Sequence, residues 1–159
     1  MIEKIESVLK ILFVYSLIII STTNGAYAES LELLKNKWSF EGLFGTFDRA
    51  SLRRGYQVYN EVCSSCHSIK LLSYRNLSEK GGPEFSIDDV KNIAASFEVI
   101  DGPNSEGEMF TRPARISDKF VEPYLNVREA EAANGGAYPP DMSVLVKARK
   151  GGANYIYSV

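Results

Sequence analysis

The chain has 159 residues and a formal net charge of −2 at pH 7, from 18 basic and 20 acidic residues. This balance lacks the basic excess typical of nucleic-acid-binding proteins, and no internal repeat or low-complexity tract is visible. The chain holds two cysteines and one histidine. Because a structural zinc site needs four ligands, these three residues are too few for one.

Residues 1–28 have the features of a secretory signal peptide. Lys4 and Lys10 give a weakly basic start, residues 11–20 are apolar, and Ala26-Tyr27-Ala28 is an A-x-A cleavage signal. A membrane-spanning helix needs about 20 apolar residues, so an uncleaved anchor is the less favoured alternative. We therefore expect export across a bacterial-type inner membrane. Residues 29–159 are then the mature chain, which is long enough for one domain.

The first helix is expected after an aromatic, glycine-punctuated loop at residues 38–47, and we expect this loop to be packed. Asp48 is suited to cap it, because an aspartate side chain accepts a hydrogen bond from the first turn. Gly55 would cost about 1 kcal/mol in mid-helix relative to alanine, and a close helix crossing would explain it. An apolar stripe at i, i+4 and i+7 predicts the buried face: Leu52, Tyr56 and Tyr59.

Residues 63–67 read Cys-Ser-Ser-Cys-His, the attachment signature of a c-type haem. In this signature two thiols bond to the vinyl-derived positions of one porphyrin edge, and the adjacent histidine binds the iron. A thioredoxin-like redox pair would expect a βαβ setting, which is not visible. A structural disulfide would leave His67 without a role. The sequence favours covalent haem attachment by Cys63 and Cys66, with His67 as an iron ligand.

A second helix is expected to start with Ser86-Ile87-Asp88-Asp89, which has a capping-box pattern. Its predicted buried face is Val90, Ile93, Ala94 and Phe97. Residues 98–118 are expected to form an irregular loop, broken by glycine and proline. This loop carries four acids without a base between Lys91 and Arg112: Glu98, Asp101, Glu106 and Glu108. They could steer a basic partner, but a solvated loop explains them as well.

Two further helices complete the predicted fold. Asn126 is suited to cap a third helix that ends at Asn134-Gly135-Gly136. Pro139-Pro140-Asp141 is expected to open a fourth, which ends at Gly151-Gly152 and carries Leu145, Ala148 and Arg149. Residues 155–157 begin another element. Short helices separated by long loops therefore predict a mainly α fold.

Several longer strings resemble the cytochrome c1 family. They are residues 38–40, 53–59, 62–68, 74–77, 101–104, 107–113 and 132–141. The resemblance covers the chain from about Trp38 to Val159. The signal peptide and residues 81–85 look most like the alphaproteobacterial members.

The resemblance implies a class I cytochrome c-like domain with one covalent haem c, inside ubiquinol–cytochrome c reductase, the cytochrome bc1 complex. Members of the family take an electron from the Rieske iron-sulfur protein and pass it to a cytochrome c. The implied partners are therefore cytochrome b, the Rieske protein and an acceptor cytochrome c. The implied location is the periplasmic face of the inner membrane.

The resemblance also implies further haem-site residues. By position, Pro139 and Pro140 line the haem pocket, Arg149 lies near a haem propionate, and Tyr155 lies in the same neighbourhood. A cation beside a propionate would offset a partly buried carboxylate. An exposed cation at a helix end is the alternative for Arg149.

In one respect the sequence departs from the family pattern. The family's axial methionine and C-terminal membrane helix are expected beyond residue 159, so we expect a C-terminally truncated member. Met142 is expected to be a core side chain, Met109 is no better a substitute, and no sixth iron ligand is assigned. An electron-transfer subunit, which is not a stand-alone catalyst, is the favoured function. An inactive fragment and a periplasmic thiol–disulfide protein that cycles Cys63 and Cys66 are the alternatives.

Overall fold

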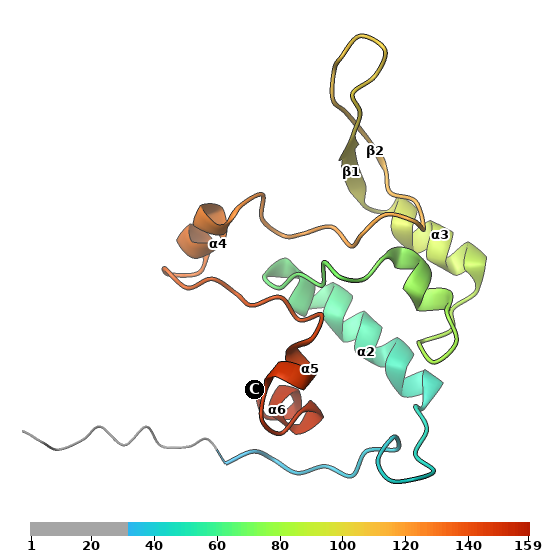
Figure 1. Cartoon of the computed structure of the whole chain (residues 1–159), viewed down its shortest axis with the longest axis vertical. Coiled ribbons are helices and arrows are strands. Elements are labelled where there is room, and N and C mark those ends of the chain that lie inside the picture. Colours follow the sequence, from blue (N-terminus) through green and yellow to red (C-terminus); the bar gives the residue numbers. More distant parts are fainter. Residues whose placement is uncertain (1–31) are drawn as a thin grey trace, which may run out of the picture. The chain divides into compact units, whose positions relative to one another are not determined.

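The computed structural model describes residues 32–159, and the predicted signal peptide lies outside them. Five α-helices and one β-hairpin are joined by long irregular stretches in this part of the chain (Figure 1). The helices are α2 (Arg49–Glu61), α3 (Ile87–Ala95), α4 (Val127–Ala133), α5 (Leu145–Ala148) and α6 (Ala153–Ser158). The strands are β1 (Glu98–Asp101) and β2 (Phe110–Pro113), and 3-10 turns cover Cys63–Ser65 and Tyr74–Ser78. The predicted mainly α fold with long loops is confirmed.

The core lies between α2, the Tyr74–Ser78 turn, α3 and the segment 114–120. Tyr74, Val90 and Ala94 are fully buried there, and Phe120 is 6% exposed. The Phe120 ring lies 4.5 Å from the Tyr74 ring and 6.2 Å from the Tyr59 ring. Tyr56 and Tyr59 of the stripe predicted on α2 therefore pack against this core, whereas Leu52 is partly buried and does not contact it. The predicted face of α3 is confirmed.

All three predicted helix caps are present. The side chains of Asp48, Ser86 and Asn126 each accept a hydrogen bond from the backbone N–H three residues on, at 3.0–3.1 Å. These bonds satisfy donors that the first turn of a helix leaves free. The close crossing considered at Gly55 is not seen, because within residues 32–159 no atom from outside the adjoining backbone of α2 lies within 4 Å of a Cβ placed there.

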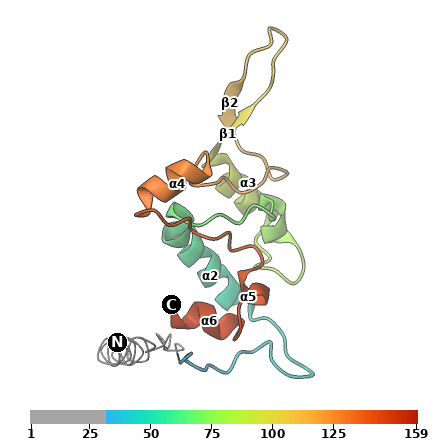
Figure 2. The ribbon, with the colours of Figure 1, turned by 60° about the vertical axis from the view of Figure 1, so that its left-hand side comes forward.

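The irregular loop expected over residues 98–118 is wrong for residues 98–113, which form a β-hairpin. β1 and β2 pair antiparallel, with Glu98 opposite Pro113 and Asp101 opposite Phe110, and they form an arm that extends beyond α3 in both views (Figures 1 and 2). β-branched and aromatic residues in both strands favour this pairing. The glycines and proline between them form the turn of the arm. Arg112 braces its base, with Nη1 2.7 Å from Asp118 Oδ2 and Nε bonded to Asp101.

The fourth helix begins later than expected. α5 starts at Leu145, whereas we predicted a start at Pro139-Pro140-Asp141. Residues 139–144 form no helix because the Asp141 side chain bonds to Ser68 and to the Lys70 backbone, which holds this segment against residues 68–70. The element expected at residues 155–157 is α6. No helix among the described residues is both long and apolar enough to cross a membrane.

The loop at residues 38–47 is anchored at one end by α6. Trp38 Nε1 donates to Asn154 Oδ1 at 2.9 Å, and its ring meets Tyr157 edge-on at 5.6 Å. Leu43 and Phe44 are 92% and 91% exposed. The packed loop predicted here is therefore confirmed at Trp38 and not at its middle.

Candidate functional site

The two cysteines occupy a tight turn that directly follows α2. The backbone N–H groups of Cys66 and His67 both donate to the Cys63 carbonyl, at 3.1 and 2.8 Å. The Ser64 hydroxyl donates to the Asn60 carbonyl, and the Ser65 hydroxyl donates to the Val62 carbonyl. These two hydrogen bonds connect the turn to the end of α2. Cys63 and Cys66 are free thiols, and each is partly exposed. The turn therefore presents two free, partly exposed sulfurs from a segment fixed by its own hydrogen bonds.

His67 contacts the chain at Pro140, 73 residues away. Its Nδ1 lies 2.8 Å from the Pro140 carbonyl oxygen. Because a carbonyl oxygen only accepts hydrogen bonds, Nδ1 carries the hydrogen in this contact. The other ring nitrogen, Nε2, then holds the lone pair that binds metals. The Pro140 carbonyl thus selects the tautomer of His67 that suits an iron ligand.

Tyr59 supports the same residue from α2. Its hydroxyl donates to the His67 carbonyl oxygen at 3.2 Å. Burial raises the pKa of Tyr59 to about 12, so the hydroxyl keeps its proton at neutral pH and remains a donor.

Asp141 joins the segment after His67 to the segment after Pro140. Its Oδ2 accepts from Ser68 Oγ and the Lys70 N–H at 2.8 and 2.9 Å, and its Oδ1 accepts from the Ser143 N–H at 2.9 Å. We call the joined segments, residues 68–71 and 141–143, the Asp141 junction. Burial acts to raise the pKa of Asp141, but hydrogen bonds from Ser143, Lys70 and Ser68 outweigh it and lower the pKa to about 2.

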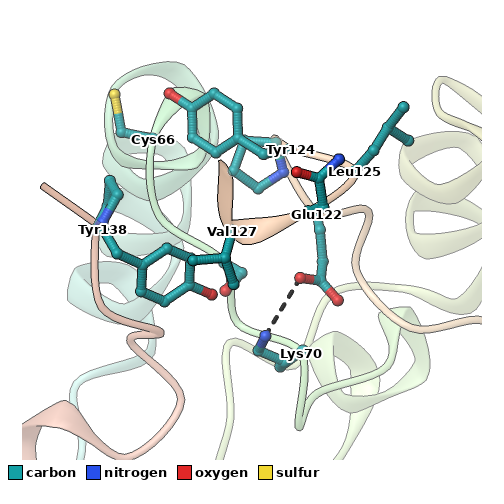
Figure 3. Close-up of a pocket in the computed structure, with 11 residues that line it drawn as sticks. Cys66, Lys70, Glu122, Tyr124, Leu125, Val127 and Tyr138 are labelled. Carbon is teal, nitrogen blue, oxygen red and sulfur yellow. Dashed lines mark hydrogen bonds and ion pairs between the residues drawn. The ribbon is translucent and has the colours of Figure 1, made fainter. Parts of the chain in front are cut away.

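A pocket of about 230 Å³ opens beside Cys66. Figure 3 shows Cys66 at one end of the pocket and the ion pair of Lys70 with Glu122, whose charged atoms are 3.3 Å apart, at the other end. Between them, the pocket is lined by Tyr124, Val127 and Tyr138. Pro139 also lines it. Sites for small molecules are typically about 300–1,000 Å³, so this pocket holds only part of a large group.

The structure brings together five of the seven predicted site residues. Cys63, Cys66 and His67 share the turn, Pro140 bonds to His67, and Pro139 lines the pocket beside Cys66.

Arg149 and Tyr155 form a separate pair. The Arg149 guanidinium carbon lies 5.9 Å from the centre of the Tyr155 ring, and Arg149 is exposed at the end of α5. Within residues 32–159, neither side chain bonds to the cysteine turn. Met142 is only partly buried, so it is not the core side chain that we expected, and Met109 is 60% exposed.

Sequence reasoning assigned no role at the site to Tyr59, Ser68 or Asp141. The sequence predicts Tyr59 on the core stripe of the first helix and Asp141 at the start of the fourth helix. The one available signal was the spacing Asp141-Met142-Ser143, which suits an aspartate that bonds to the backbone two residues on. Nothing local indicated the partners at residues 68–70.

The chemistry of these donors fits a covalent haem better than a bare metal ion. Among the residues that the structure describes, no three His, Cys, Asp or Glu side chains gather to hold an ion. Two free thiols precede a histidine whose Nδ1 is already bonded. That set suits a group held by covalent bonds to sulfur and by one ligand to its iron.

A profile of the Cytochrome C1 family matches residues 38–159. The chain belongs to the cytochrome c1 family. "Cytochrome c1-1, heme protein, mitochondrial" of Solanum tuberosum is 51% identical to this cytochrome c1 chain over 129 residues, which are 81% of the chain and 39% of that relative. Cytochrome c1 of Rhodospirillum rubrum is 51% identical over 129 residues, which are 81% of the chain and 46% of that relative.

A third relative, "Cytochrome b/c1" of Bradyrhizobium diazoefficiens, is 51% identical over 120 residues, which are 76% of the chain and 18% of that relative. The cytochrome c1 chain thus spans less than half the length of these relatives. The identities to the plant and bacterial proteins are equal, so they favour neither group.

Proposed function

We propose that this chain carries one covalent haem c and transfers electrons as part of a cytochrome bc1 complex. One observation supports this most directly. His67 Nδ1 is bonded to the Pro140 carbonyl at 2.8 Å, directly after two free thiols. The relative from Solanum tuberosum is named a heme protein, which agrees with the proposal.

In this proposal, each residue of the turn has one task. Cys63 and Cys66 would hold the haem through two thioether bonds, each formed by addition of an S–H across a vinyl C=C with no change of oxidation state. His67 Nε2 would bind the iron, while the Pro140 carbonyl holds Nδ1. When bound, the haem supplies a one-electron couple whose potential depends on its ligands and their hydrogen bonds.

Around the turn, three further residues are proposed to line or tune the site. Pro139 lies beside Cys66 on the pocket wall. Arg149 is proposed to neutralise a propionate, which agrees with its lack of a carboxylate partner among residues 32–159. Tyr155 holds the Arg149 guanidinium against its ring.

The proposed electron path runs from a Rieske iron-sulfur protein to a cytochrome c, beside cytochrome b. A relative named cytochrome b/c1 supports the neighbourhood with cytochrome b. The predicted signal peptide supports a place at the periplasmic face of the inner membrane. Of the four acids considered for docking, Asp101 is paired with Arg112, whereas Glu106 and Glu108 are exposed near the turn of the arm. Those two remain available to attract a basic cytochrome c.

The test is covalent haem on this chain, exported and co-expressed with a cytochrome c maturation system. After denaturation and washing, the pyridine haemochrome spectrum should show one haem per chain. Replacing Cys63 and Cys66 together by alanine should abolish it, whereas the control Ser64→Ala, between the two cysteines, should keep it. A wild-type chain without covalent haem would contradict the proposal. Thiol titration would then separate a thiol–disulfide protein, which has a reversible dithiol, from an inactive fragment.

A second measurement tests whether the sixth coordination position of the iron is open. Carbon monoxide added to the reduced, loaded chain should change the visible spectrum if that position is open. If carbon monoxide is excluded, a side chain such as Met142 closes it, and replacing Met142 by alanine should then restore carbon monoxide binding.

A further inference from the structure

The Asp141 junction lies next to the contact that fixes the His67 ring. Ser68 directly follows His67, and Asp141 directly follows Pro140. The Asp141 carboxylate bonds to Ser68 Oγ, to the Lys70 N–H and to the Ser143 N–H at 2.8–2.9 Å. The Met142 N–H adds a bond to the Ser68 carbonyl at 2.8 Å. Two segments 73 residues apart are therefore joined within one residue of the histidine and of its acceptor.

This geometry leaves the Pro140 carbonyl little freedom. Consecutive Cα atoms are about 3.8 Å apart across a planar peptide, so fixing Ser68 and Asp141 also fixes the residues before them. Ser68 is 5% exposed, so its bond to Asp141 is shielded from water. The separation of His67 Nδ1 from Pro140 O is thus set largely by the Asp141 junction.

We propose that Asp141 is a positioning residue for His67: its carboxylate holds the Pro140 carbonyl against Nδ1 and keeps the ring in the tautomer whose Nε2 can bind iron. The inference rests on the proposed function, in which His67 is an iron ligand. A hydrogen bond to the outer nitrogen of a metal-bound histidine fixes its orientation and raises its basicity. Asp141 therefore acts on the iron through two intervening groups without touching it.

A series of variants separates this role from simple stabilisation. Asp141→Ala removes all three acceptor bonds. Asp141→Asn keeps the shape but turns an NH₂ group toward at least one donor, so it should retain part of the effect. Asp88→Asn is the matched control, because Asp88 is exposed on α3, pairs with Lys91 at 3.0 Å, lies outside the pocket beside Cys66, and also loses one negative charge.

The experiment uses the whole, haem-loaded chain. The first readout is the exchange rate of the His67 Nδ1 proton with water, measured by NMR in the reduced, carbon monoxide-bound form. The second is the midpoint potential. Changes behind a metal-bound histidine typically alter affinity or activity by roughly 10–100-fold. We expect proton exchange to accelerate about tenfold in Asp141→Ala.

A weaker histidine donor stabilises the ferric state less, so the midpoint potential should rise. A tenfold change in the redox equilibrium is about 59 mV for a one-electron couple. Asp141→Asn should shift both readouts less and in the same direction, and Asp88→Asn should shift neither.

Each outcome decides the question. If Asp141→Ala unfolds more easily but keeps the wild-type exchange rate and potential, Asp141 is structural only and the proposal fails. Equal shifts in Asp88→Asn would also refute it, since charge alone would then explain them. If Asp141→Ala does not accumulate, Ser68→Ala removes one junction bond and should show the same effects at smaller size; no effect there would overturn the proposal.

A failure of the proposed function can be distinguished from a failure of the positioning role, because the wild-type chain would then carry no haem. In that unloaded chain, ¹⁵N shifts of the His67 ring still report its tautomer. Asp141→Ala should then mix the two tautomers if the positioning role holds, and should leave a single tautomer if it does not.

Discussion

The buried hydroxyl of Tyr74 leads to a specific prediction about the free energy of unfolding. Tyr74 is fully buried, and its Oη has no hydrogen-bond partner in the described part of the chain. Burial raises the pKa of Tyr74, and the nearby Val121 amide acts in the opposite direction, but this amide does not reach hydrogen-bond geometry. A buried hydroxyl without a partner costs about 1–3 kcal/mol.

Replacing Tyr74 by phenylalanine removes this cost and keeps the ring. The contacts with Phe97 at 5.6 Å and Phe120 at 4.5 Å remain. Allowing for the small void left by the oxygen, we expect stabilisation by about 1 kcal/mol. For a domain of this size, that is a rise of about 4 °C in Tm.

Tyr59→Phe is the matched control for Tyr74→Phe. The Tyr59 hydroxyl does have a partner, the His67 carbonyl at 3.2 Å, so its removal should destabilise by about 1 kcal/mol. Differential scanning calorimetry of the two variants at neutral pH should therefore give Tm shifts of opposite sign. A lower Tm for Tyr74→Phe would refute the reasoning, because it would show that the hydroxyl is satisfied, for example by Val121 or a buried water.

Two further predictions concern pH and the arm. The pKa of Asp141 is about 2 in the folded chain, whereas its ordinary value is 3.8. The ionised carboxylate therefore stabilises the fold above about pH 4, and this stabilisation is lost as the pH falls toward 2. After solvent screening, the stabilisation amounts to about 1–2 kcal/mol. Urea unfolding of Asp141→Asn and wild type should thus differ at pH 7 and converge near pH 2, and a difference independent of pH would contradict this cause. Asn104 Oδ1 accepts from the Glu106 and Glu108 N–H groups at 3.0 and 2.8 Å, so Asn104→Ala should speed cleavage by a glutamate-specific protease about fivefold. Ser105→Ala is the control. If Asn104→Ala is cleaved no faster than Ser105→Ala, Asn104 does not hold the turn of the arm.

The elements that sequence predicted well depend on neighbours a few residues apart. Each helix cap joins residues three positions apart, such as Ser86 and Asp89. The hairpin was missed because its evidence is a pairing between Glu98 and Pro113, whereas the glycines and proline between them were counted only as breakers. The start of α5 was misplaced because the partners of Asp141 lie 71–73 residues away.

The candidate site likewise has one part that the local sequence predicts and another part that only the fold shows. The turn with Cys63, Cys66 and His67 is local, and its pattern indicated its chemistry. Pro140 came only from a family resemblance, and only the structure shows that its carbonyl oxygen is the group that meets His67. The contribution of Asp141 needs the fold, because a carboxylate in an isolated sequence has no visible donors.

The length of chain between His67 and Pro140 sets an order of events in folding. The cysteine turn needs only contacts within α2 and the residues just after it, so it can form early. The His67–Pro140 contact closes a loop of 73 residues, which costs roughly 4 kcal/mol of chain entropy beyond a constant term. That cost is met only once the segments between them have folded. The tautomer of His67 therefore reports completion of the whole domain, whereas the reactivity of the thiols reports only the turn that carries them.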